Sequence, residues 1–406
     1  MRILIIKQLW NPEPTAKSMD FAKELVNRGH SVQVLTGFPN YPTGKIYDGY
    51  KQSLFLREDL EGIEVIRVPV YPSHSSSAIK RILNYFSFAI TASILGPFLC
   101  RKANISFAYQ GAMTVSIPAI VMKLTRRIPY IYDVNDLWPE TLVTSGMIRR
   151  SWIINALHLW DWLNVKLAAH VTVATNGFLN GYLDKGLSKD KFTIVSNWSR
   201  DEFASEQLDD DTRLRIFPVN TFNILYAGNL GVVQSLKTVI DGVLEARQMS
   251  SKEIQLVLIG DGAEKKELKL YVRSNNFSFV QFIDRVSSGV ITKYLNSADC
   301  LVVHLKKDPI FERTIPSKIL SYMRTGKPVL LGLSGEASEL IHNANAGLSF
   351  EPEESSDLAE KILKLIKEIE TKVDPCYNGG PSYYNTYLSM EASVDKLEQL
   401  FYKKVR

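Results

Sequence analysis

Apolar positions along this chain follow two different periods in alternation. Short runs of β-branched and aliphatic residues predict buried strands, and the longer segments between them, with apolar residues at helical spacing, predict amphipathic helices. Regular alternation of the two predicts parallel sheets with helices on both faces, which is the α/β class of fold. In the first half we expect strands at 2–7, 31–37, 63–69, 105–109, 129–134, 171–175 and 192–196.

The same alternation starts again after a polar stretch at 201–221, which offers few groups for burial and is interpreted as a linker. Further strands are expected at 222–228, 254–259, 280–283, 300–305, 328–332 and 347–350. The pattern therefore predicts two doubly wound, Rossmann-like domains at 1–200 and 222–385. The C-terminal segment 386–406 is expected to form an amphipathic helix that packs on one domain, the first domain being a candidate.

Composition excludes some kinds of site. The 406 residues are 45% hydrophobic and 22% charged, which is ordinary for a globular protein. The net charge of +5 permits attraction to anionic phosphates or lipid headgroups without requiring it, and no nucleic-acid partner is expected. Three cysteines lie far apart, which favours a reducing compartment, and the apolar N-terminal run is too short for a signal peptide, so we expect a cytoplasmic protein. The histidines are scattered and Asp209-Asp210-Asp211 falls in the expected linker, so no metal is expected.

Two glycine-containing loops follow strands of the second half. Ligands in doubly wound sheets lie beyond the carboxyl ends of the strands. In Gly228-Asn229-Leu230-Gly231 the glycines would let backbone amides approach a phosphate, although a tight turn is the alternative. Gly260-Asp261-Gly262 could hold a nucleoside beside it. Neither loop completes a dinucleotide fingerprint or a Walker motif, so no nicotinamide cofactor is expected.

A helix with both ends marked begins at Pro316-Ser317-Lys318 and ends before Gly326. Lys318 lies in its first turn, where a cation opposes the helix dipole unless an anion is nearby. This placement favours a phosphate partner, and a solvated lysine is the alternative.

Acidic residues close the expected strand 129–134. Asp136 and Glu140 follow this strand end, where a carboxylate could act as a general base or accept hydrogen bonds from sugar hydroxyls. The alternative is an Asx turn with a helix cap, which is strongest for Asp133.

The segment 79–102 is apolar and is bracketed by Lys80-Arg81 and Arg101-Lys102. It lies between strands of one sheet, so it is not expected to span a bilayer. A helix lying in the membrane interface, with residues such as Phe86, Phe88 and Phe98 facing lipid, and a buried crossover helix both fit the pattern.

These motifs resemble the group 1 glycosyltransferases, whose GT-B fold sets two Rossmann-like domains face to face across a cleft. The resemblance covers nearly the whole chain and is strongest to the branch that makes bacterial surface polysaccharides, within it to N-acetyl-L-fucosamine transferases of O-antigen and colanic-acid-type pathways. It rests on Pro12-Glu13-Pro14, Arg28-Gly29-His30, the segment 35–42, Asp136-Leu137-Trp138-Pro139-Glu140, Gly228-Asn229-Leu230-Gly231 and Pro316-Ser317-Lys318.

The resemblance implies transfer of a sugar, with retention, from a nucleotide diphosphate, a UDP-linked donor being favoured. The acceptor would be a saccharide on a polyprenyl diphosphate at the inner face of the plasma membrane, in O-antigen or capsule synthesis. Lys318, the helix start and the glycine-loop amides would stabilise the leaving diphosphate, with Ser317 and Ser321 also at the donor. Asp136 and Glu140 would orient donor sugar or acceptor.

Two departures from the family pattern matter. The EX7E signature would place glutamates at Arg313 and Ser321, with Glu312 one residue out of register, and the first-domain histidine is replaced by Asn135. Ser321 could still bond a hydroxyl, and Asp136 would take a larger share of catalysis. A nucleotide-sugar epimerase of the same fold and a non-catalytic nucleotide-sugar-binding protein remain alternatives.

Overall fold

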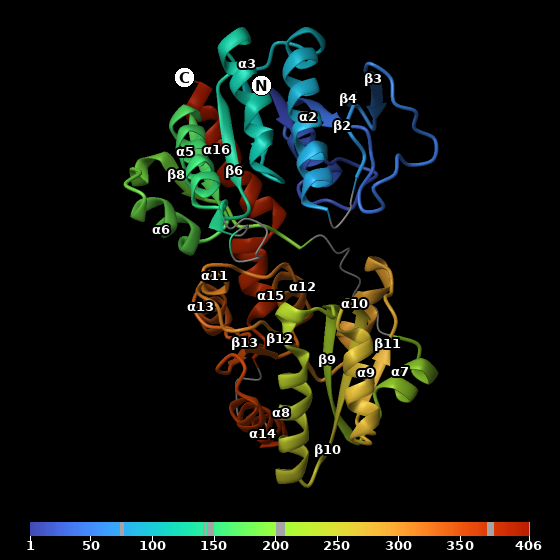
Figure 1. The fold of residues 1–406 in the computed structure, drawn as a ribbon. Coiled ribbons are helices and arrows are strands. Elements are labelled where there is room, and N and C mark those ends of the chain that lie inside the picture. The colour runs from blue at the N-terminus through green and yellow to red at the C-terminus, as the bar shows by residue number, and fades with distance from the viewer. Residues whose placement is uncertain (74–76, 141–142, 144–149, 200–207, 372–376, 406) are drawn as a thin grey trace. The chain divides into compact units, whose positions relative to one another are not determined.

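The chain folds into two compact units of α/β structure (Figure 1). In this computed structural model, residues 1–73, 77–140, 143, 150–199, 208–371 and 377–405 are described. The first unit is Met1–Ser196 together with the segment that starts at Met390, and the second unit is Asn197–Ser389. The α/β class and the doubly wound architecture expected from the sequence are therefore confirmed.

The first unit is built on an eight-stranded sheet in the order β3-β4-β2-β1-β5-β6-β7-β8. Its strands are parallel except for the edge strand β3, which pairs antiparallel with β4 and was not predicted. A short strand that alternates between half-buried and exposed residues lacks the continuous apolar run by which the others were found. The strands are β1 (Arg2–Ile6), β2 (Ser31–Gly37), β3 (Leu56–Leu60), β4 (Ile63–Val68), β5 (Ile105–Tyr109), β6 (Tyr130–Val134), β7 (His170–Val173) and β8 (Phe192–Ile194).

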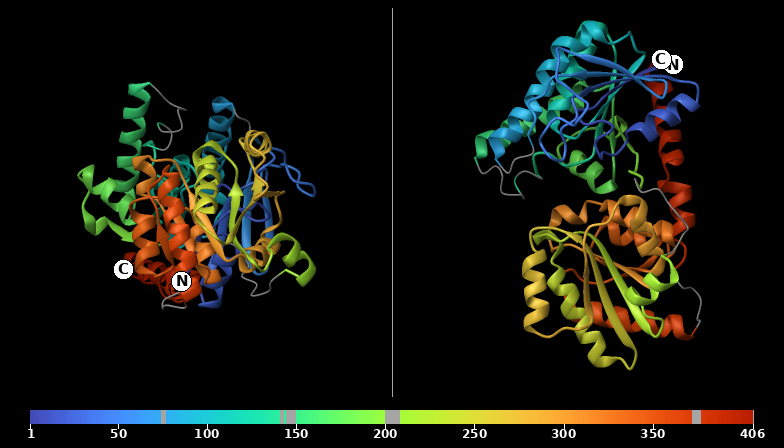
Figure 2. Two further views of the ribbon diagram at one scale, coloured as in Figure 1. Left: turned by 90° about the horizontal axis from the view of Figure 1, so that it is seen from below. Right: turned by 90° about the vertical axis from the view of Figure 1, so that its right-hand side faces the viewer.

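Helices cover both faces of this sheet (Figure 2). One face carries α2 (Ala78–Leu99), α3 (Ser116–Arg126), α5 (Ser151–Leu167) and α6 (Asn176–Asp184), whose apolar residues share one core cluster. The other face carries α1 (Met19–Asn27) and α16 (Met390–Val405), where Phe107 contacts both Phe21 and Phe401. Glu398 of α16 pairs with His30 at 2.8 Å and with Arg28 at 3.2 Å, so the C-terminal helix is part of the first unit.

The second unit has a six-stranded sheet, all parallel, in the order β11-β10-β9-β12-β13-β14. The strands are β9 (Thr221–Asn229), β10 (Glu253–Asp261), β11 (Val280–Ile283), β12 (Cys300–His304), β13 (Val329–Gly332) and β14 (Gly347–Ser349). One core cluster lies under α8 (Leu236–Met249), α9 (Lys265–Ser274) and α14 (Ser355–Thr371). The opposite face is covered by α7 (Asp210–Ile216), α10 (Ser288–Ser297), α12 (Ser317–Thr325), α13 (Glu336–Asn343) and α15 (Gly380–Tyr383).

The expected linker differs from the structure. Residues 200–207 lie outside the described part, but α7 occupies much of the rest, and its Ile216 and the following Phe217 are buried in the core of the second unit. Asp209 caps this helix by accepting a hydrogen bond from the amide of Thr212 at 2.9 Å. Aspartate is favoured both in loops and at helix starts, so the acidic run alone could not distinguish a linker from the beginning of a helix. The acidic run therefore marks the start of a helix.

Candidate functional site

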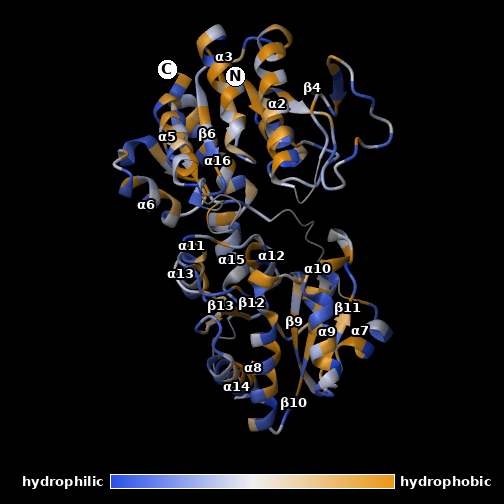
Figure 3. Cartoon of the chain, viewed as in Figure 1, coloured by the Kyte–Doolittle hydropathy of each residue, from blue (hydrophilic) through white to orange (hydrophobic). Residues whose placement is uncertain are grey.

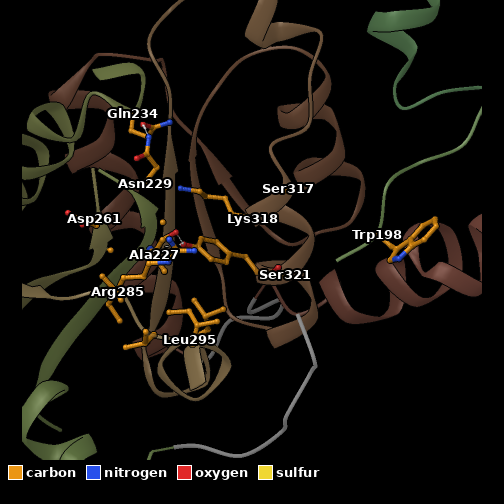
Figure 4. A pocket seen from close by; sticks show the side chains of 16 residues that line it. Trp198, Ala227, Asn229, Gln234, Asp261, Arg285, Leu295, Ser317, Lys318 and Ser321 are labelled. Atoms are coloured by element: carbon orange, nitrogen blue, oxygen red, sulfur yellow. Dashed lines mark hydrogen bonds between the residues drawn. The ribbon is translucent and has the colours of Figure 1, made fainter. Parts of the chain in front are cut away.

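A pocket of about 610 Å³ lies at the carboxyl ends of β9, β10 and β11 and beside the first turn of α12 (Figure 4). All of its lining residues belong to the second unit. They are Trp198, Ala227, Gly228, Asn229, Gln234, Ile259, Gly260, Asp261, Arg285, Val286, Ile291, Leu295, Ser317, Lys318, Ser321 and Tyr322. The pocket is where ligands bind in doubly wound sheets.

Most of the donor-site residues expected from the sequence meet in this pocket. Seven of them line it, namely Gly228, Asn229, Gly260, Asp261, Ser317, Lys318 and Ser321. Leu230, Gly231 and Gly262 do not, and their three amides are already bonded inside the protein. The amide of Leu230 donates to the carbonyl of Asp261 at 2.8 Å, that of Gly231 to Gln234 Oε1 at 3.2 Å, and that of Gly262 to Asp261 Oδ1 at 2.9 Å. These three amides are therefore not free for a phosphate.

Sequence reasoning missed Arg285 and Val286, which follow β11 directly. Ligands are expected at the carboxyl ends of all strands in such a sheet, and these two residues lie in the loop after β11. Their position after a predicted strand could therefore have marked them as candidates. Ile291 and Leu295 of α10 were missed for another reason, since an apolar residue on a helix gives no sign that it lines a pocket. Only the packing of α10 against the strand ends brings them to the pocket.

The glycines of the pocket are required by the protein as well as by any ligand. Gly228 and Gly260 have φ values of +146° and +145°, which disfavour other residues. A Cβ atom on Gly260 would lie 1.8 Å from the carbonyl oxygen of Gly228, and one on Gly228 would lie 2.7 Å from Lys318 Nζ. The two glycines therefore allow adjacent strand ends and the lysine to approach closely.

Lys318 and Arg285 are the basic residues that line the pocket. The Nζ of Lys318 donates to the hydroxyl of Tyr226 at 2.6 Å and lies 3.9 Å from the centre of that ring. Figure 4 shows the side chain pointing toward the strand end that carries Asn229. Within the described ranges no carboxylate forms an ion pair with it, and burial lowers the pKa of its ammonium to about 7. A bound anion would reverse this shift, so the geometry suits a phosphate.

Ser321 and Glu312, the two residues considered in place of the family glutamates, lie in different surroundings. Ser321 lines the pocket, and its Oγ lies 3.0 Å from Ser199 Oγ. Glu312, the last residue of α11 (Pro309–Glu312), is exposed and does not line the pocket. In this structure Glu312 therefore does not stand in for a family glutamate at the pocket.

Asp136 stands at the carboxyl edge of the first sheet, after β6. Gln110 Oε1 accepts hydrogen bonds from the amides of Asn135 at 3.0 Å and Asp136 at 3.2 Å, which fixes this turn. The Asp136 side chain keeps contact with solvent, but the surrounding protein displaces enough water to raise the pKa of its carboxyl to about 6. A carboxylate in this range is suited to exchange protons near neutral pH.

The other acidic residues of this edge are tied into ion pairs. Glu140 Oε1 lies 2.9 Å from Lys185 Nζ, which also approaches the buried Asp161 at 3.5 Å. Buried Asp133 pairs with Lys17 at 2.7 Å and accepts from Thr172 Oγ1 at 2.6 Å. This supports a structural role for Asp133, and it leaves Glu140 less accessible than Asp136.

A second feature of the first unit is the apolar composition of α2, visible as the orange colouring along this helix in Figure 3. Among the described helices, Ile79–Leu99 is the one with the length and apolar composition to cross a membrane, and 28% of its apolar window is buried. Phe88 is fully buried, contrary to its expected contact with lipid, because it points into the core. The exposed apolar residues of the stripe are Ile79, Ile82, Leu83, Phe86, Ile90, Ile94 and Phe98.

The chain matches two models of glycosyltransferase families. One, described as glycosyl transferases group 1, matches residues 221–368, and the other, a glycosyl transferase 4-like domain, matches residues 14–198. The Escherichia coli K12 protein named as the colanic acid biosynthesis glycosyl transferase WcaI is 22% identical over 340 residues, which is 80% of this chain and 82% of that protein.

Solved structures share the fold of this chain over its full length. HepE of Anabaena, in complex with UDP, has a TM-score of 0.69 at 15% identity and covers 99% of this chain and 100% of its own. WaaG, described as a glycosyltransferase involved in lipopolysaccharide biosynthesis, has a TM-score of 0.64 at 15% identity and covers 99% of each chain. The two units are thus those of the GT-B fold. Over its second unit the chain matches the group 1 glycosyl transferases, and over its first unit the glycosyl transferase 4-like domain, so both units are similar to glycosyltransferases.

Proposed function

We propose that this chain transfers a sugar from a UDP-linked donor to a lipid-linked saccharide, with retention, in the synthesis of a bacterial surface polysaccharide such as O-antigen or capsule. The observation that carries the proposal is the pocket at the strand ends of the second unit, with Lys318 at its wall, whose ammonium pairs with no carboxylate of the described residues. The UDP bound in the HepE complex supports a UDP-linked donor. The colanic acid and lipopolysaccharide pathways named for WcaI and WaaG support a role in polysaccharide synthesis. N-acetyl-L-fucosamine is our candidate sugar, on the motif resemblance.

The pocket offers two ways to stabilise a leaving diphosphate. The first turn of α12 presents backbone amides at its positive dipole end, and Lys318 supplies a full charge beside them. Such preorganised groups act most strongly on charge that develops in the transition state. No metal ion is needed for this neutralisation, and the described residues hold no cluster of metal-ligating side chains. We therefore propose chemistry without a metal cofactor.

Asp136 is our candidate for orienting or deprotonating the acceptor hydroxyl. It follows β6 on a turn fixed by Gln110, and its carboxyl has a pKa raised to about 6. Glu140 is assigned a lesser role because Lys185 already occupies one of its oxygens.

We further propose that the protein lies at the inner face of the plasma membrane, with the stripe of α2 against the lipid. Seven large apolar side chains are exposed along this helix, and Phe98 is 85% exposed. Exposed patches of this kind mark interaction surfaces. Exposed Lys80, Arg101 and Lys102 bracket the stripe, which suits anionic headgroups. Both ends of α2 join strands of one sheet, so the helix would lie along the interface.

Titration calorimetry with UDP, GDP, ADP and dTDP tests the donor class, with UDP expected to bind most tightly. Incubation with radiolabelled UDP-sugars and membrane extract then tests transfer. Label appearing in the lipid fraction supports a glycosyltransferase. Conversion of the free nucleotide sugar without an acceptor would indicate an epimerase, and binding without any turnover would indicate a non-catalytic protein.

A further inference from the structure

Tyr226 has no role in the function proposed so far, yet it contacts Lys318, one of the basic residues that line the pocket. It lies near the end of β9 and is fully buried in the core cluster under α8, α9 and α14. Its hydroxyl accepts a hydrogen bond from Lys318 Nζ at 2.6 Å and donates one to the carbonyl oxygen of Asn229 at 2.6 Å. A single buried hydroxyl therefore joins the catalytic cation candidate to the loop after β9.

A lysine side chain has many rotamers, and holding it in one of them costs conformational entropy. Lys318 rises from the first turn of α12, and no ion pair in the described part of the chain fixes its ammonium. The Tyr226 hydroxyl and ring face supply two attractive contacts at one position, with Nζ 3.9 Å from the ring centre. The space is kept open by Gly228, where a Cβ atom would lie 2.7 Å from Nζ.

We propose that Tyr226 is a positioning residue that holds Lys318 where the diphosphate of the donor lies, without neutralising its charge. The chemical reason is the kind of partner. A carboxylate in this place would hold the ammonium equally well but would cancel the charge that the ligand needs. A neutral hydroxyl, whose proton is committed to the Asn229 carbonyl, turns a lone pair to the ammonium and leaves its positive charge for an anion.

The inference rests on the proposed function, since it assigns Lys318 to the donor diphosphate. Tyr226→Phe deletes the hydroxyl and keeps the ring. The matched control is Tyr271→Phe, which deletes the hydroxyl that bonds Asp241 between α9 and α8, away from the pocket lining. We expect Tyr226→Phe to weaken binding of UDP and of inorganic diphosphate about tenfold, the loss of one charged hydrogen bond. The control should bind both as wild type does.

A double-mutant cycle with Lys318→Ala separates positioning from a general effect on the fold. If Tyr226 acts through Lys318, adding Tyr226→Phe to Lys318→Ala should cause no further loss of diphosphate affinity. Equal losses in both backgrounds would overturn the inference, and so would an unchanged affinity in Tyr226→Phe. Because the probe is inorganic diphosphate, the coupling can be present in a protein that transfers no sugar. Coupling between Tyr226 and Lys318 in a protein that transfers no sugar would contradict the proposed function and leave the positioning role of Tyr226 intact.

Discussion

The carboxyl edges of the two sheets use charged side chains differently. In the first unit, Lys17 is paired with Asp133, and Lys185 lies between Glu140 and Asp161. In the second unit, Lys318 faces the pocket with a neutral tyrosine as its partner. A buried charge that is already paired serves the fold, whereas one left without a counter-charge is costly unless a ligand supplies it. This difference is the reason why we propose that the donor diphosphate binds to the second unit.

The largest effect is expected from Asp136→Asn. The variant keeps the shape of the side chain but removes its charge, so transfer should be lost while UDP binding to the second unit stays as in the wild type. In the wild type, kcat/KM should rise with pH through about 6, where this carboxyl ionises. Calorimetry and a radiolabel assay measure the two properties separately. Loss of UDP affinity in this variant would contradict the division of labour between the units.

Lys318→Ala is expected to lower turnover by about 10²-fold or more, the scale for loss of one preorganised charge-stabilising group. The melting temperature at pH 6 should not fall. The pKa of this lysine is lowered in the folded state from 10.5 to about 7, so the unfolded chain binds the proton more readily between these pH values. The cost to folding grows as the pH falls through this window and is fully present at pH 6. Turnover equal to that of the wild type would return Lys318 to the role of a solvated lysine.

The next prediction concerns the exposed apolar stripe of α2 in the first unit. Phe86→Ser with Phe98→Ser should reduce cosedimentation with vesicles containing anionic lipid by about tenfold, since each exposed ring contributes part of the 1.5–3 kcal/mol of full burial. Thermal stability should be spared because both side chains are exposed. Phe88→Ser is the matched contrast, because a polar group at this buried position should lower the melting temperature sharply.

A dimer interface on the same stripe would give a different result in that experiment. The wild type would then sediment as a dimer without lipid, and the double variant would become a monomer. Vesicle binding that is equal in wild type and double variant would remove the membrane from the proposal.

The smallest expected effect is the pH dependence of donor binding. UDP should bind the ammonium form of Lys318, so its affinity should be several-fold lower at pH 9 than at pH 7, as the proton is lost above about pH 7 in the free protein. Calorimetry in buffers of different ionisation enthalpy should detect uptake of a proton on binding. The Lys318→Ala variant should show neither effect, and a proton uptake that persists in it would assign the titration to another group.

Local pattern was sufficient for most strands, because a buried parallel strand is a short apolar run wherever its neighbours lie. It failed at β3, which is half-exposed, and at α7, whose acidic start resembles a loop. For α2 it left two interpretations open, since a helix that is apolar on all sides shows no period that distinguishes its core face. The structure gives it one buried face and one exposed face.

For the candidate site, too, local sequence was sufficient for some features and not for others. The sequence was sufficient to predict the two α/β series, the strand-end loops that reach the pocket and the place of Lys318 in the first turn of its helix, because helix ends and glycine turns are encoded within a few residues. Tertiary structure decided which charges are neutralised, since the partners lie far away in sequence. Lys17 reaches Asp133 across 116 residues, and Lys318 reaches Tyr226 across 92. The availability of a charge to a ligand depends on such contacts, and only the folded chain makes them.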